Sequence, residues 1–414
     1  MLAASRPEEA AVVASSRTAK GPRWRRTLLA GFSCAALLLA PLSGPSPAWA
    51  QDSASSAGAG AWCESSQTTE QLDAAVADTL RLTGVPGVAV GVWGPHCRYE
   101  KAFGVADKAT GAPMRTDFYS RIGSETKTFT VTGVLQLVDE GKIGLDDPIA
   151  EYVPGVPAGD RITLRQLARM QSGLFPYSAD EDFYRALVTD PYRPWTPQEL
   201  LAYSFRHPLD FPPGEGLEYS NTNTILLGLV VEQVSGLPLH EYIEQRIAEP
   251  LGLEHTLFPT DASFPQPHAP GYTTQTPDGS ETVATDWNPS SGWAAGAMIS
   301  TLDDLRTWAR AVATGALLSP ATQAQRLQTV TGPPFPPDVG YGLGLLVAQG
   351  WIGHNGSLPG YQSLTLYLPQ QQTTLVVLLN SDEPGPDVPV PSSAFGTAIT
   401  KIISPDHVFH LQAS

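Results

Sequence analysis

The stretch RIGSETKTFTVTGVLQLVDEG, residues 121–141, constrains the fold more than any other part of the sequence. Its second half has apolar residues at helical spacing and ends at Gly141, a residue type common at helix C-termini. We therefore expect a helix that opens near Ser124 and runs to about Glu140. Because most of its positions are apolar or small, we expect this helix to lie in the interior of the protein.

Ser124 and Lys127 stand three residues apart at the start of this predicted helix. This spacing is about one helical turn, so the hydroxyl and the amine would lie on the same face. A nearby lysine favours deprotonation of a serine, and the N–H groups at a helix start stabilise developing negative charge. A capping serine beside a solvated lysine is the alternative. The apolar residues after Lys127 favour a buried lysine and a nucleophilic Ser124.

Two strands are expected before this helix and three near the end of the chain. The stretches 87–94 and 98–107 have the composition of an antiparallel strand pair. The apolar and β-branched stretches 341–349, 360–368 and 373–380 predict three successive strands. Strands at both ends of the chain predict one antiparallel sheet built from both ends.

Helical patterns flank these strands and fill the middle of the chain. Helices are expected at 66–84, 301–314 and 394–403, and residues 142–290 contain short helical pieces with few clear strands. We therefore predict an α+β fold, in which an antiparallel sheet is flanked by helices and carries an inserted, mostly helical domain at about 142–290.

The first fifty residues have the pattern of a secretory signal peptide. Six Lys and Arg precede the apolar run LLAGFSCAALLLAPL (28–42), and Ala48-Trp49-Ala50 has the small-x-small pattern of a cleavage site. The apolar run is shorter than the roughly 20 residues needed to span a bilayer, which argues against the alternative of a membrane anchor. We expect cleavage after Ala50, export by the Sec or the twin-arginine route, and no stable membrane anchor.

Composition excludes several classes of protein. The 414 residues carry 25 Lys and Arg against 41 Asp and Glu, and removal of residues 1–50 changes the net charge from −16 to −20. Binding of nucleic acid needs a clustered positive field, so we expect no nucleic-acid partner. The sequence has no HExxH or CxxC motif, and we expect no metal and no cofactor. Cys63 and Cys97 would remain in an oxidising compartment, where a disulfide is favoured over two separate thiols.

Two further motifs carry chemical groups. Tyr219-Ser220-Asn221 follows a turn and precedes a predicted helix at 224–236, so it can offer a phenol and an amide. The stretch GHNGS (353–357) has small residues at the start of a strand, which permit close backbone approach to a ligand and an oxyanion-hole N–H. The alternatives are a packed tyrosine beside a capping asparagine, and a hairpin turn.

The order and spacing of Ser124, Tyr219 and His354 resemble the serine β-lactamase and penicillin-binding hydrolase superfamily. The likeness is nearest to class C β-lactamases and to secreted D-alanyl-D-alanine carboxypeptidases with a His-x-Gly third motif. It extends over about residues 66–405, including the stretches 121–154, 162–174, 211–236, 341–345 and 353–361. The resemblance implies a β-lactamase/transpeptidase-like fold.

The resemblance also implies a two-step acyl transfer. Ser124 would form an acyl-enzyme, Lys127 would help to activate it, and Tyr219 would shuttle a proton to the leaving group. Water would then release the acyl group. A catalytically silent penicillin-sensing or cell-wall-binding module is an alternative from a different class.

The remaining implied site residues bind substrate. Asn221 would hold a substrate amide, and the backbone N–H groups of Ser124 and Ser357 would form the oxyanion hole. His354 would line the opposite wall with Asn355 and Gly356 and share proton transfer with Tyr219.

One departure from the family pattern bears on which substrate we expect. Carboxypeptidases of this type carry an arginine on the strand before the third motif, and Leu346 stands at the matching place in an ungapped comparison. The bidentate clamp for a peptide carboxylate is therefore missing. We expect a secreted D-alanyl-D-alanine carboxypeptidase, with an esterase, a D-amino-acid amidase or aminopeptidase, or a class C-like β-lactamase as alternatives.

The expected domain layout follows from these assignments. A signal peptide (1–50) and a flexible lead-in (51–65) precede one hydrolase domain (66–405), and a short tail (406–414) ends the chain. We expect a monomer that acts on a peptide or small acyl substrate.

Overall fold

The computed structural model describes residues 65–411, apart from residues 96, 334, 384, 386 and 387. The predicted signal peptide, most of the lead-in, Cys63 and residues 412–414 lie outside the described residues. Cys97, the predicted partner of Cys63, is disulfide-bonded. No helix among the described residues combines the length and the apolar character that crossing a bilayer requires.

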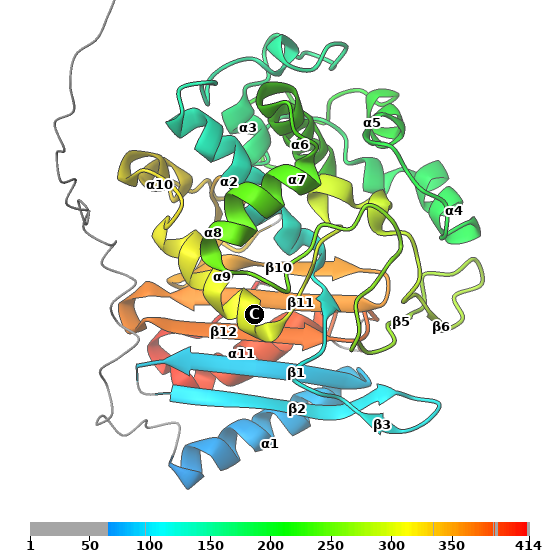
Figure 1. The fold of residues 1–414 in the computed structure, drawn as a ribbon, viewed down its shortest axis with the longest axis vertical. Helices are drawn as coiled ribbons and strands as arrows, with labels where there is room; N and C mark the ends of the chain where they lie inside the picture. Colours follow the sequence, from blue (N-terminus) through cyan, green and yellow to red (C-terminus); the bar gives the residue numbers. More distant parts are fainter. Residues whose placement is uncertain (1–64, 96, 334, 384, 386–387, 412–414) are drawn as a thin grey trace, which may run out of the picture. The chain divides into compact units, whose positions relative to one another are not determined.

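An eight-stranded antiparallel sheet forms the centre of the described part (Figure 1). Its N-terminal strands are β1 (Gly87–Gly94), β2 (Cys97–Asp107) and β3 (Ala112–Pro113). Its C-terminal strands are β8 (Val339–Tyr341), β9 (Leu346–Ala348), β10 (Trp351–Leu358), β11 (Tyr361–Leu368) and β12 (Thr373–Leu379). The spatial order is β3-β2-β1-β12-β11-β10-β9-β8, so the sheet is built from both ends of the described chain, as predicted.

The two ends of the chain meet where β1 pairs with β12, with Val90 opposite Val377. Helices cover both faces of β1, so nearly all of its residues are buried and its sequence is almost continuously apolar. Alternate side chains point to opposite faces. Val90 packs in the same core cluster as Phe395 and Ile399, whereas Ala89 belongs to the cluster on the other face.

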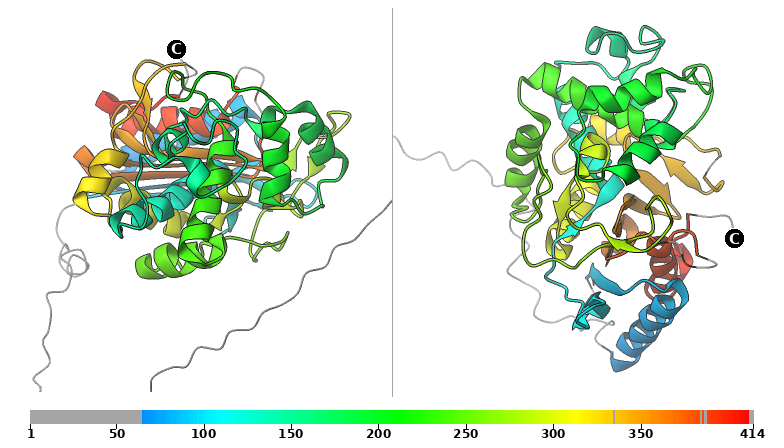
Figure 2. Two further views of the ribbon diagram at one scale, coloured as in Figure 1. Left: turned by 90° about the horizontal axis from the view of Figure 1, so that it is seen from above. Right: turned by 90° about the vertical axis from the view of Figure 1, so that its right-hand side faces the viewer.

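One face of the sheet is covered by α1 (Ser66–Thr83) and α11 (Pro391–Ile403), which lie side by side in Figure 2 in blue and red. The other face carries α9 (Leu302–Thr314), which packs on β1, β10, β11 and β12. Behind α9 lies α2 (Thr126–Asp139), where Phe129 stacks on Trp308 at a centroid distance of 3.8 Å. This second face positions the candidate site.

The regular secondary structure of residues 142–290, all of them described, is mostly helical, with short helices separated by turns and loops. These residues contain α3 (Leu164–Ala168), α4 (Glu181–Thr189), α5 (Pro197–Phe205), α6 (Asn221–Ser235), α7 (Leu239–Ile243) and α8 (Glu249–Leu251). Their only strands are β5 (Tyr272–Thr273) and β6 (Thr282–Val283), which pair with each other. The remaining strands are the pair β4 (Ser120–Arg121) and β7 (Ile299–Ser300), and the remaining α-helix is α10 (Pro320–Arg326).

Several predicted boundaries differ from the structure. The helix expected from Ser124 begins with a 3-10 turn, η4 (Gly123–Glu125), before α2 starts. The strand expected at 341–349 is two strands, because the chain turns between β8 and β9 at Gly344, which has a φ of +70°. Residues 353–357 lie within β10 rather than at its start, because the strand already begins at Trp351.

The expected tail packs on the domain as far as it is described. Phe409 is fully buried in the cluster with α11, and its backbone N–H donates to Thr400 Oγ1. Trp351 Nε1–H donates to the carbonyl oxygen of His407 at 2.7 Å. Residues up to 411 therefore belong to the domain, because an aromatic side chain of the last segment completes its core.

Candidate active site

Ser124 and Lys127 are in direct contact. Lys127 Nζ donates to Ser124 Oγ at 2.9 Å and to the carbonyl oxygen of Ala295 at 2.8 Å. Ser124 is half-buried in η4, and Lys127 is fully buried in the first turn of α2. The turn from η4 into α2 thus places the two side chains side by side, and the residue pair expected from the sequence is assembled.

Burial lowers the pKa of Lys127 well below its ordinary value of 10.5. No carboxylate is hydrogen-bonded to its nitrogen, whose protein partners in the described structure are a hydroxyl and a carbonyl. Burial therefore favours the neutral form of the amine. A neutral amine can accept the proton of Ser124, which is the condition for a lysine to act as a general base.

Tyr219 lies above the same lysine, just before α6. Lys127 Nζ is 4.9 Å from the centroid of the tyrosine ring. Burial raises the pKa of Tyr219 above its usual range, and the nearby Ser124 side chain counters part of that rise. The phenol is thus protonated at neutral pH. Among the described residues its buried oxygen has no hydrogen-bond partner, so it is available to a substrate.

Asn221, the first residue of α6, is held in one orientation. Its amide nitrogen donates to Ser178 Oγ at 3.1 Å, whereas its buried Oδ1 has no partner in the described part of the chain. A carbonyl oxygen with no partner can accept a hydrogen bond from an N–H group. The geometry therefore suits Asn221 for binding the N–H of a substrate amide.

His354 lies on β10, opposite Lys127, and is only 2% exposed. Its Nδ1 is 2.5 Å from the carbonyl oxygen of Asn355, so Nδ1 carries the proton, and Nε2 accepts from Tyr341 Oη at 3.2 Å. Burial lowers the pKa of His354 to about 3, with a smaller contribution from Lys127 when its amine is protonated, so the ring is neutral. Proton sharing with Tyr219 is not available directly, because both ring nitrogens have other partners.

Two glycines allow η4 to approach β10 closely. Gly123 has a φ of +50°, and a Cβ on it would lie 2.6 Å from the backbone nitrogen of Ser357. A Cβ on Gly356 would lie 1.9 Å from the carbonyl oxygen of Ile122. The backbone at Ser357 is thereby brought next to the turn that carries the nucleophile, which is the arrangement that a two-N–H oxyanion hole requires.

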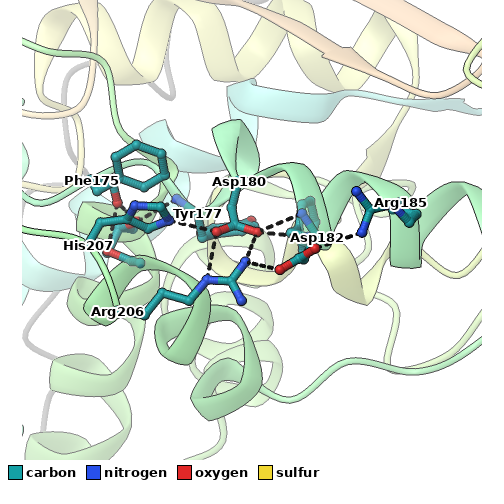
Figure 3. A network of polar contacts seen from close by, with 10 residues as sticks. Phe175, Tyr177, Asp180, Asp182, Arg185, Arg206 and His207 are labelled. Atoms are coloured by element: carbon teal, nitrogen blue, oxygen red, sulfur yellow. Dashed lines mark hydrogen bonds and ion pairs between the residues drawn. The ribbon is translucent and has the colours of Figure 1, made fainter.

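A charged network surrounds Asp180, which directly follows the turn that contains Ser178 (Figure 3). Asp180 is 2% exposed, caps α4, and accepts from Arg206 Nε at 2.8 Å and from His207 Nε2 at 2.7 Å. These contacts lower the pKa of Asp180 despite its burial. The network fixes the 3-10 turn η6 (Tyr177–Ala179), which contains Ser178.

Sequence reasoning missed three contributors to the site. They are the carbonyl oxygen of Ala295, the phenol of Tyr341 and the hydroxyl of Ser178. Tyr341 lies in the stretch 341–345, which resembles the family, but nothing in the sequence indicated that it contacts His354. The other two come from loops with no chemical motif, and only the fold brings them to the site.

No cluster of three or more His, Cys, Asp or Glu that could hold a metal ion occurs among the described residues.

Comparisons with known proteins give a consistent result. The family model described as Beta-lactamase matches residues 72–393. A putative penicillin-binding protein, PbpX, from Bacillus subtilis is 28% identical over 311 residues, which cover 74% of this chain and 73% of PbpX. A putative D-alanyl-D-alanine carboxypeptidase from Escherichia coli is 34% identical over 175 residues, which cover 39% of this chain and 40% of the relative.

The fold also matches solved structures. A D-stereospecific amidohydrolase from Streptomyces sp. superposes with a TM-score of 0.72 at 34% identity, over 82% of this chain and 98% of that one. The antiparallel sheet and flanking helices of this chain therefore match the fold of that amidohydrolase.

Proposed function

Because this chain belongs to the Beta-lactamase family of serine β-lactamases, penicillin-binding proteins and related serine hydrolases, we propose that it cleaves amide bonds that follow a D-amino acid, through an acyl-enzyme on Ser124. The observation that carries the proposal is the contact between Ser124 and the buried Lys127, where burial favours the neutral form of the amine. The similarity to an amidohydrolase described as D-stereospecific supports the choice of substrate.

The proposed first step begins with transfer of the Ser124 proton to the neutral amine of Lys127 while the serine oxygen attacks the carbonyl carbon. The N–H groups of Ser124 and Ser357 stabilise the negative charge on the carbonyl oxygen. Tyr219 gives its proton to the leaving nitrogen and regains one from Lys127, since the raised pKa of the phenol keeps it protonated. The C–N bond breaks and the acyl-enzyme remains.

The second step is the reverse sequence with water. The same groups take a proton from water, which attacks the acyl carbon, and return a proton to Ser124 as its oxygen leaves. Asn221 Oδ1 accepts a hydrogen bond from the substrate's N–H throughout, because it has no other partner within the described structure.

The structure favours substrates without a terminal carboxylate over a D-alanyl-D-alanine carboxypeptidase substrate. The place of the carboxylate-binding arginine is taken by Leu346, which carries no charge. Leu346 is 3% exposed on β9 and packs in an apolar cluster of the core. His354 is neutral and cannot supply a cation in its place. The carboxypeptidase remains the second candidate, and the similarity to the putative carboxypeptidase of Escherichia coli supports it.

A matched pair of substrates tests the proposal. We expect D-phenylalanine amide to be hydrolysed and its L-enantiomer to be hydrolysed much more slowly. We also expect an N-acyl-D-alanyl-D-alanine amide to have a higher kcat/KM than the same peptide with a free carboxylate. Activity must disappear in S124A. A clear preference for the free carboxylate would identify the carboxypeptidase instead, and retained activity in S124A would reject Ser124 as nucleophile.

Export remains part of this proposal. The basic, apolar and small-residue order of residues 1–50 supports a cleaved signal peptide and an enzyme that works outside the cytoplasm. We also propose that the enzyme is a monomer. N-terminal sequencing of protein from the culture medium should begin at Gln51, and size-exclusion chromatography should give the mass of one chain.

A further inference from the structure

A buried glutamate directly follows the nucleophile. Glu125 ends the turn η4 and is 1% exposed. Among the described residues neither of its carboxyl oxygens has a hydrogen-bond partner. A buried carboxylate without a partner is strongly unfavourable, so this side chain needs a physical explanation that the proposed mechanism does not supply.

The surroundings of Glu125 connect it to the strand that completes the site. The turn η4 packs against β10 and β11. The hydroxyls of Ser363 and Thr365 on β11 are close enough to affect the carboxyl, and Thr365 Oγ1 is itself buried without a partner in the described chain. In the sheet, Ser363 pairs with Gly356 and Thr365 with His354. The carboxyl thus lies behind the segment of β10 that faces the nucleophile.

Burial keeps this carboxyl neutral. It raises the pKa of Glu125 from 4.5 to about 8, and the hydroxyls of Ser363 and Thr365 counter only part of the rise. A protonated carboxyl is a hydrogen-bond donor. Thr365 Oγ1, which lacks a partner in the described chain, is a suitable acceptor after a small rotation of either side chain.

None of the charged groups on the neighbouring elements named below stabilises an ionised Glu125 carboxylate. From α2, Lys127 directs its nitrogen to Ser124 and Ala295. From β10, His354 is neutral at the pH values considered. On α9, which packs on the same strands, Asp304 accepts from Thr256 and from the backbone of His255, while Arg306 lies over Trp93, 5.3 Å from the ring centroid. None of these groups is among those that shift Glu125.

We propose that Glu125 is a positioning residue that works as a neutral acid, holding η4 against β10 and β11 so that the backbone N–H groups of Ser124 and Ser357 stay aligned. The inference rests on the proposed role of Ser124. Ionisation places an unpartnered charge inside the domain, which drives the side chain toward water and displaces the turn. The enzyme therefore loses turnover at alkaline pH through its oxyanion hole, while its affinity for substrate changes little.

The pH dependence of kcat tests this inference. From about pH 6 to about pH 10, kcat of the wild type is expected to fall about tenfold per pH unit above about pH 8. E125Q, which is neutral throughout, should retain most of kcat at neutral pH and lose the alkaline decline. E125A should have a low kcat at every pH with little change in KM. E254Q, a change at an exposed glutamate, is the control for loss of one charge.

A negative result for Glu125 can be told apart from a negative result for the proposed role of Ser124. If E125Q shows the same alkaline decline as the wild type, or if the wild type shows none, Glu125 has no such role. Infrared spectroscopy gives a readout that needs no substrate: the wild type should lose one protonated-carboxyl band between about pH 7 and about pH 9. E125D keeps a carboxyl at this position and serves if E125Q does not fold. Absence of the band at neutral pH would overturn the inference, whereas inactivity in S124A bears only on the nucleophile.

Discussion

The side-chain nitrogen of Lys127 lies 2.9 Å from the hydroxyl oxygen of Ser124, and both groups are shielded by the surrounding helices. This contact joins the turn η4, which holds Ser124, to the first turn of α2, which holds Lys127. Because burial lowers the pKa of the lysine, the pair combines a nucleophile and a base without a carboxylate hydrogen-bonded to the lysine nitrogen.

The first prediction concerns pH and Lys127. The neutral amine is the active form, so activity should rise as pH increases through the lowered pKa of Lys127 and should be lost below it. K127R should reduce kcat by about 10³-fold, since arginine stays protonated. K101R, a change at a half-exposed lysine paired with Asp73, is the control. Steady-state kinetics of K127R within a few-fold of wild type would contradict the assignment.

The second prediction concerns the close approach of η4 and β10. Alanine at Gly356 would place a Cβ 1.9 Å from the carbonyl oxygen of Ile122 and push the two segments apart. We expect kcat to fall by about 10² or more in G356A, the scale of a lost oxyanion donor, with a smaller effect on KM. S280A, a change at an exposed residue on the β5–β6 connection, is the control. An unchanged kcat in a folded G356A would show that the contact is not needed.

The third prediction concerns substrate binding by Asn221. N221A removes the only amide oxygen that we expect to accept from the substrate, so kcat/KM should fall by about 10- to 100-fold. S178A leaves the amide in place but removes its 3.1 Å partner, and should cause a smaller loss. S280A, on the exposed β5–β6 connection, should have no effect. Equal losses in N221A and S280A would reject the role.

The fourth prediction concerns the stability provided by Asp180. Because the pKa of Asp180 is lowered in the folded protein, the ionised carboxylate stabilises the fold at pH values above its pKa in the unfolded chain, about 3.9. This stabilisation is lost as the pH falls through the pKa of the folded protein. D180N should reduce the free energy of unfolding at neutral pH by about 1–3 kcal/mol, since Arg206 and His207 lose their shared partner. Urea denaturation of D180N and of D160N, a change at an exposed aspartate outside this network, measures the difference.

The fifth prediction concerns stability and Glu125. The raised pKa means that the folded protein binds one more proton than the unfolded chain between about pH 4.5 and about pH 8, so this group makes stability fall as pH rises through that window. E125Q should therefore gain up to about 1.4 kcal/mol per pH unit relative to the wild type across the window and then level off. A difference independent of pH would mean that Glu125 is ionised in the folded protein.

Much of the fold follows from local patterns in the sequence. The continuous apolar content of β1 and the helical spacing of α1 predicted these elements to within a residue or two. The Ser124–Lys127 spacing placed both side chains on one face of the chain. Boundaries were less accurate where an αL glycine broke a strand, as at Gly344, because one residue's backbone freedom leaves only a weak trace in the periodicity.

The sequence by itself determined the local features: the strands and helices, the nucleophile and lysine one turn apart, and the resemblance to a family of serine hydrolases. Only the tertiary structure decided the environment of each group. It buried Glu125 behind β10, bonded His354 to Tyr341, and supplied the carbonyl oxygen of Ala295 to Lys127. Helix and strand patterns arise from neighbours in the chain, whereas burial, and with it pKa and reactivity, depends on residues far apart in sequence that meet in the folded protein.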